Sequence, residues 1–202
     1  MKELIIFIII FLFVFTASVF IFNGRFIYAQ IKYSFIGPAP TFDFHRDILF
    51  KGLVKEKDVF PQKISVPSIG IEAPIVISGS SDNISLQKDL EKGVIYLPGS
   101  APLNEKGNIV IMGHSSAYPW YRGQYGSIFA LLNNLNPGDE IFILSSKGKA
   151  YTYQVVGKEV KAPKDLVFQV QEDESVLYLV SCWPINTAWK RIVIKAVAID
   201  RN

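Results

Sequence analysis

The feature that most constrains this chain is an apolar run near its N-terminus, Leu4–Phe22, in which only Thr16 and Ser18 carry polar side chains. As a helix with a rise of about 1.5 Å per residue, the run would be roughly 28 Å long, close to the hydrocarbon thickness of a bilayer. A helix satisfies its backbone hydrogen bonds internally, as lipid requires. We therefore expect residues 1–22 to be a short cytoplasmic end followed by a transmembrane anchor.

A cleaved signal peptide is the alternative interpretation of this run. The apolar part of a signal peptide is usually about 7–15 residues long, which is shorter than this run, and the small residues that could mark a cleavage site lie inside it. Positive charges stand on both sides, with Lys2 before the run and Arg25 and Lys32 after it. The positive-inside rule therefore gives no orientation.

The remaining chain divides into a spacer and one globular part. Residues 23–60 are expected to form an extracytoplasmic stalk, because Pro38 and Pro40 favour an extended spacer. His45 lies in this stretch and is expected to be solvated. Residues 61–202 are of a length that suits a single domain.

The globular part is rich in short β-branched runs separated by turn residues, which is typical of a barrel. Short helices are expected over 84–92, ended by Gly93, and over 127–135. The sequence therefore predicts a mostly β fold, a closed eight-stranded β-barrel with short helices, preceded by one N-terminal transmembrane helix. The expected strands are 64–66, 74–77, 94–97, 108–112, 140–144, 150–160, 175–181 and 191–199.

Charge and cysteine content exclude several classes of protein. The net charge is only +3 and there is no Lys/Arg run, which argues against a nucleic-acid binder. One cysteine and two histidines permit no internal disulfide and no four-ligand structural zinc site without carboxylates. No spacing typical of zinc ligands occurs either.

Three residues at strand ends stand out. Cys182 closes the apolar run LYLVSC and is followed by Trp183 and Pro184, and proline interrupts strand pairing. His114 closes GNIVIMGH, and Arg191 opens RIVIKAVAI. Each has an ordinary alternative: a buried core cysteine, a hydrogen-bonded histidine at the barrel rim, and a solvated arginine with Arg122 and Lys190 as rival cations.

Together, the three residues meet the needs of cysteine catalysis. An unperturbed thiol has a pKa of about 8.5, so little thiolate exists at neutral pH. A nearby imidazolium stabilises the thiolate and can later protonate a leaving amine. A guanidinium, which is always charged, can donate to the oxyanion that forms when a carbonyl is attacked.

The residues around these three resemble the motifs of the sortase family. The segment YLVSC, Tyr178–Cys182, is similar to the family's T-L-x-T-C, with Tyr178 and Ser181 in place of the two threonines. The segment GNIVIMGH, Gly107–His114, matches G-N-x-V-I-x-G-H, and LPGSAP over 97–102 and ISVPSIGIEAPIV over 64–76 are similar to the segments that precede it. The order His, Cys, Arg is the sortase order, and the resemblance covers residues 61–202.

The resemblance implies a cysteine transpeptidase with His114, Cys182 and Arg191 as catalytic residues, and we expect no metal and no organic cofactor. Such an enzyme cleaves a C-terminal sorting motif of secreted proteins through a thioester on Cys182. It then transfers the acyl group to an amine of a peptidoglycan precursor or of a pilin lysine. We expect the catalytic domain to be extracytoplasmic on a single-pass membrane protein, with Ser181 and Trp183 contacting the substrate.

The resemblance leaves the subtype open. Residues 23–60 lack the Asp-Pro-aromatic motif of the lid found in many pilin-polymerising sortases, which weighs modestly toward a surface-anchoring role. The acidic residues Glu172, Asp173 and Glu174 are expected to be solvated and not to bind calcium. Two other functions are also compatible with the sequence: a non-catalytic membrane-anchored β-domain, and a cysteine endopeptidase that uses water as the acceptor.

Overall fold

The structure is a computed structural model, which describes residues 2–36, 59–80, 82–103, 105–117, 121, 123–168 and 173–199. The expected stalk residues Pro38, Pro40 and His45 lie outside the described residues, as do Arg122 and Glu172.

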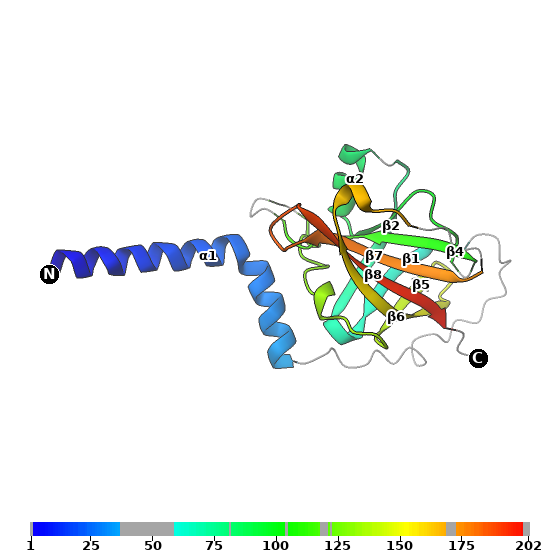
Figure 1. The fold of residues 1–202 in the computed structure, drawn as a ribbon, viewed down its shortest axis with the longest axis horizontal. Coiled ribbons are helices and arrows are strands. Elements are labelled where there is room, and N and C mark those ends of the chain that lie inside the picture. Colours follow the sequence, from blue (N-terminus) through cyan, green and yellow to red (C-terminus); the bar gives the residue numbers. More distant parts are fainter. Residues whose placement is uncertain are drawn as a thin grey trace.

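The N-terminal helix α1, Lys2–Ile36, extends well beyond the apolar run that predicted it. Its segment Lys2–Ile21 is long and apolar enough to cross a membrane, and its large apolar side chains are exposed. The helix continues because no proline occurs before Pro38, and proline is the residue that removes a helical hydrogen bond. Figure 1 shows that α1 changes direction along its length.

Eight strands close into a barrel, which confirms the predicted fold. Their order around the barrel is β1-β2-β3-β4-β7-β8-β6-β5, and Figure 1 shows β4, β7 and β8 side by side. Neighbouring strands are antiparallel except for the pairs β2–β3 and β4–β7, which are parallel. The strands are β1 Pro61–Val66, β2 Ile71–Ile77, β3 Val94–Tyr96, β4 Gly107–Met112, β5 Glu140–Ser145, β6 Ala150–Lys161, β7 Ser175–Trp183 and β8 Lys190–Ile199.

The short helices differ in their agreement with the sequence. Helix α2, Asn83–Leu90, lies where one was expected, and the Asp82 carboxylate caps it by accepting from the amides of Ile84 and Ser85. The second expected helix, over 127–135, is instead a series of turns ending in the 3-10 helix η3, Leu132–Asn134. Two further single-turn 3-10 helices are η2, Pro67–Ile69, and η4, Pro163–Asp165.

Two apolar clusters lie on the two faces of the barrel wall. The larger one takes residues from all eight strands and fills the interior; from β7 it includes Leu177 and Leu179. The smaller one, here called the outer-face cluster, comes from β4, β7 and β8 alone. Its buried members are Val110, Val176, Tyr178, Val180 and Val193, and Leu166 and Phe168 from the β6–β7 connection pack against it.

Candidate active site

Strand pairing places the three predicted catalytic residues in one row. In the parallel pair β4–β7, Met112 lies beside Val180, so continuing both strands by two residues places His114 beside Cys182. In the antiparallel pair β7–β8, Cys182 lies directly opposite Arg191. Directly opposite residues in a sheet project their side chains from the same face, with Cβ atoms about 4.5–5.5 Å apart.

Cys182 faces away from the barrel interior. Side chains alternate along a strand, and Tyr178 and Val180 of β7 belong to the outer-face cluster while Leu179 belongs to the interior. Cys182 therefore continues the outer face. It is a free cysteine with intermediate exposure, which differs from the fully buried core cysteine of the alternative interpretation.

The segment that carries His114 is tied to β7 and to the loop that follows it at three points. The Gly113 amide donates to the Val180 carbonyl over 3.1 Å, and the Ser181 hydroxyl donates to the Gly113 carbonyl over 2.7 Å. The Asn186 amide, in the β7–β8 loop, donates to the Ser116 hydroxyl over 2.9 Å. These bonds extend the β4–β7 pairing beyond Met112 and hold His114 at the level of Cys182.

The His114 side chain is half-buried. Its ring meets the ring of Tyr121 edge to face, with centroids 5.4 Å apart and planes at 82°. Within the described residues, its Nε2 atom is buried and has no hydrogen-bond partner. Burial lowers the pKa of His114 from its ordinary value, because the charged imidazolium loses hydration.

Arg191 is held by the β7–β8 loop. Its Nη1 atom donates to the carbonyls of Ala188 and Lys190 over 3.1 and 3.0 Å. A guanidinium has five N–H donors, so further donors remain for a substrate oxygen. The rival cation Lys190 is opposite Trp183, on the other side of the alternation from Cys182.

The two expected substrate-contacting residues have different surroundings. Ser181 is only 2% exposed, and its hydroxyl is engaged with Gly113. Trp183 is partly buried and packs against the interior cluster. Their contact with a substrate stays a prediction, as do the catalytic roles of the three residues in the row.

Two features of the site were not predicted from the sequence. The ring of Tyr121 on His114 and the bond from Asn186 to Ser116 both depend on the paths of loops, which hydrophobic periodicity does not encode. Asn186 has a positive φ of 65°, a conformation that asparagine adopts more readily than most residues. Together with Pro184, the asparagine was a local signal for a turn after Cys182.

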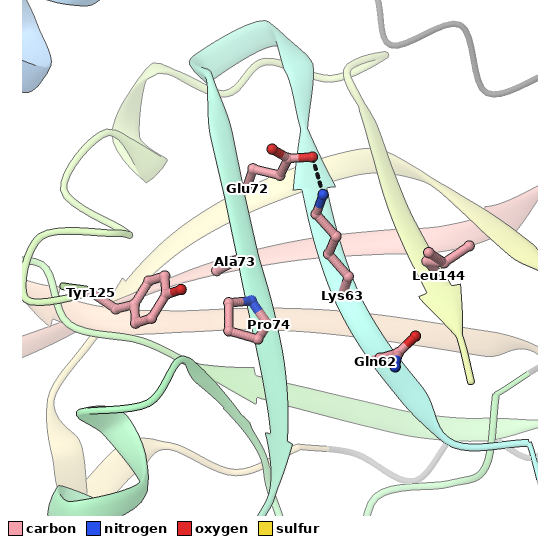
Figure 2. Close-up of a pocket in the computed structure, with 7 residues that line it drawn as sticks. All are labelled: Gln62, Lys63, Glu72, Ala73, Pro74, Tyr125 and Leu144. Atoms are coloured by element: carbon pink, nitrogen blue, oxygen red, sulfur yellow. Dashed lines mark ion pairs between the residues drawn. The ribbon is translucent and has the colours of Figure 1, made fainter. Parts of the chain in front are cut away.

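A separate cavity of about 360 Å³ lies on the outside of β1, β2 and β5. Figure 2 shows it with the ion pair between Lys63 and Glu72 and with Tyr125 near Pro74. It contains none of the residues of the row and no cysteine or histidine. Among the described residues, no group of three or more His, Cys, Asp or Glu side chains is arranged to hold a metal ion, and the expectation of no metal stays a prediction.

Comparison with known proteins agrees with the motifs. A family model described as the sortase domain matches residues 64–199. Sortase D of Bacillus subtilis (strain 168) is 30% identical over 135 residues, which are 65% of this chain and 60% of that protein. Sortase A of Bacillus anthracis is 26% identical over 139 residues, which are 65% of this chain and 56% of that protein. Each match thus spans less than two thirds of the relative's own length.

A solved structure extends the comparison to the fold. The lid mutant of sortase A from Corynebacterium diphtheriae aligns with a TM-score of 0.59 and 24% identity, covering 73% of this chain and 74% of that chain. At this identity the likeness shows the fold alone.

The bond from Ser181 to Gly113 gives a testable prediction about what positions His114. Ser181→Ala removes the donor and leaves the Gly113 carbonyl without this partner, so the free energy of unfolding should fall by about 1–3 kcal/mol. Ser181→Thr keeps a hydroxyl and should restore much of the loss. Chemical denaturation followed by circular dichroism measures all three proteins.

Ser115 provides a matched control. It is also only 2% exposed, but its hydroxyl has no hydrogen-bond partner within the described part of the chain. Ser115→Ala should therefore change stability little or raise it. An equal loss in Ser115→Ala and Ser181→Ala would show that the bond to Gly113 has no special importance.

Proposed function

The chain belongs to the sortase family, and on that premise we propose that it is a membrane-anchored cysteine transpeptidase. It would cleave a C-terminal sorting motif of secreted proteins and transfer the acyl group to an amine. The observation that supports this most strongly is the register that sets His114 beside Cys182 and Cys182 opposite Arg191. One nucleophile, one acid/base group and one fixed cation then face a single substrate position.

In the first step, the Cys182 thiolate attacks a backbone carbonyl carbon of the sorting motif. A carbon–sulfur bond forms, and the carbonyl electron pair moves onto oxygen. Arg191 projects from the strand beside the sulfur, so its guanidinium can donate to the developing oxyanion. Preorganised donors of this kind typically contribute about 10²–10³ in rate.

In the second step, the oxyanion collapses and the carbon–nitrogen bond breaks. The leaving amine takes a proton from the His114 imidazolium, and the acyl group remains on Cys182 as a thioester. An incoming amine then attacks the thioester and gives its proton to the neutral His114. A new amide forms, and Cys182 returns as thiolate beside an imidazolium.

The outer-face cluster is buried, with Leu166 and Phe168 of the β6–β7 connection packed against it, and it ends at the more exposed Cys182. It leads along β7 from Tyr178 through Val180 to Cys182, between β4 and β8. An extended peptide presents every second side chain to one surface. We propose that the residues preceding the scissile bond lie beside the β6–β7 connection where this cluster ends at Cys182, with Ser181 holding the His114 segment and Trp183 near the leaving group.

The partners and location follow from the same proposal. The acceptor would be an amine of a peptidoglycan precursor or of a pilin lysine, and the substrates would be secreted proteins with a sorting motif. Residues 1–22 would anchor the chain in the cell membrane, residues 23–60 would form a stalk, and residues 61–202 would act outside. The apolar segment Lys2–Ile21 of α1 supports the anchor.

Trapping the thioester tests the mechanism. When a library of C-terminal sorting peptides is mixed with the protein and no amine is added, intact-protein mass spectrometry should detect an acyl adduct. Cys182 is the only cysteine, so Cys182→Ala should form none while keeping its fold. His114→Ala should slow the adduct by about 10²–10⁴-fold, the usual effect of losing a general acid or base.

The acceptor decides between transpeptidase and endopeptidase. Added amine should convert the adduct to an amide product faster than water hydrolyses it. Hydrolysis alone at any amine concentration would favour the water-using endopeptidase. Peptide cleavage by Cys182→Ala at the wild-type rate would contradict the proposed mechanism itself.

The anchor has its own test. In native cells the protein should fractionate with membranes, and protease added outside should cleave after Phe22. Recovery of a soluble chain that lacks residues 1–30 would instead establish a cleaved signal peptide. Protection of the barrel from external protease in intact cells would contradict the proposed orientation.

A further inference from the structure

We infer that Tyr121 is a positioning residue that fixes the orientation of the His114 imidazole; this inference rests on the proposed function for its catalytic meaning. The reason lies in three contacts that hold the tyrosine ring in one place. Of the three residues in the row, only His114 takes part in these contacts.

The first contact is with the imidazole. The two rings meet at 82° with centroids 5.4 Å apart, within the range in which edge-to-face aromatic pairs are favourable. His114 lies two residues beyond β4; its carbonyl accepts from the Phe129 amide, and the preceding Gly113 amide donates to the Val180 carbonyl. These bonds hold the backbone of His114 but do not set the torsion angles of its side chain. Its ring orientation therefore depends on what packs against it, and Tyr121 is such a neighbour.

The second contact ties Tyr121 to a distant element. Its hydroxyl donates to the Leu90 carbonyl over 2.8 Å, and Leu90 is the last residue of α2. The final carbonyls of a helix have no partner within that helix, so the bond satisfies a group that would otherwise need water. It also fixes the far end of the phenol ring.

The third contact is with Gly123. A Cβ atom built on Gly123 would lie 2.5 Å from the Tyr121 hydroxyl oxygen and 2.6 and 2.7 Å from two ring carbons. Such distances are shorter than side-chain contacts allow, so only glycine permits the ring to lie where it does. The backbone at Gly123 thus closes the space beside the phenol.

Fixing the ring has a chemical consequence for His114. The Tyr121 ring packs against the half-buried imidazole, and burial lowers the pKa of His114. Among the described residues, the titratable or charged groups that contact or strand register places near His114 are the Tyr121 phenol, Cys182 on β7 and, one strand further, Arg191 on β8. A ring held in this way keeps its nitrogens directed for proton transfer, and a displacement of about 1 Å can cost roughly 10²-fold in rate.

The test measures the His114 pKa directly. The full-length protein in detergent micelles is labelled on histidine and titrated by NMR, with His45→Gln used to assign the two signals. Tyr121→Phe removes the bond to Leu90 and keeps the ring, so the pKa of His114 should rise part of the way toward its ordinary value of 6.5. Tyr121→Ala removes both contacts and should raise it further.

Two more variants separate positioning from general damage. Gly123→Ala keeps the tyrosine but displaces its ring, so the pKa of His114 should rise there too. Tyr125→Phe makes the same chemical change as Tyr121→Phe on a side chain that lines the cavity of Figure 2, and it should leave the titration unchanged. Under the proposed function, kcat/KM of Tyr121→Ala should fall by about tenfold to a hundredfold.

The titration needs no substrate, so its outcome is independent of the transpeptidase proposal. If no acyl adduct forms on Cys182 but the pKa of His114 rises as expected, the proposed function fails and the positioning contact stands. A His114 titration that is the same in wild type, Tyr121→Phe and Gly123→Ala would overturn the inference. Equal shifts in Tyr125→Phe and Tyr121→Phe would overturn it as well.

Discussion

The pairing of β7 with β4 on one side and with β8 on the other positions every group of the proposed active site. Three side chains that are far apart in the sequence become neighbours because Met112 lies beside Val180 and Cys182 lies opposite Arg191. Register in a sheet is strict, since a shift by one residue turns each side chain to the opposite face. A shift of β7 would therefore direct Cys182 into the barrel.

The same strand explains why the site can be both well anchored and open. The interior side of β7 is fully packed through Leu177 and Leu179, which stabilises the strand against slipping. Its outer side carries the outer-face cluster and ends at the half-exposed Cys182. Both sides of β7 are therefore packed along its length, and the strand becomes accessible to a peptide at its end, at Cys182.

Much of this arrangement could be predicted from the sequence because strands carry a clear signal. Side chains alternate along a strand, so Val110, Met112 and His114 share a face, and the first two do lie at the outer-face cluster. The end of helix α1 was harder to predict, because hydropathy identifies a membrane span but does not indicate where a helix ends. The stretch 127–135 has helix-like spacing, yet the Phe129 amide donates to the His114 carbonyl, a tertiary contact that periodicity does not encode.

Most of the contacts that the sequence could not predict are made by loop residues. Tyr121 lies seven positions after His114, and nothing in its neighbours indicates that its hydroxyl meets Leu90 or that Gly123 makes room for its ring. Likewise, Asn186 and Ser116 carry no pattern that links them before the fold brings their loops together. These contacts join segments that no local rule relates, and they are what complete the surroundings of His114.

The central claim is that the β4–β7 register makes His114 and Cys182 one coupled pair. The most direct measurement is the rate of Cys182 alkylation by iodoacetamide as a function of pH, read by intact-protein mass spectrometry, in wild type and in His114→Ala. The sole cysteine makes the signal specific. Alkylation of wild type at neutral pH should be faster than that of His114→Ala, because a neighbouring imidazolium favours the reactive thiolate. Superimposable profiles for the two proteins would contradict the claim.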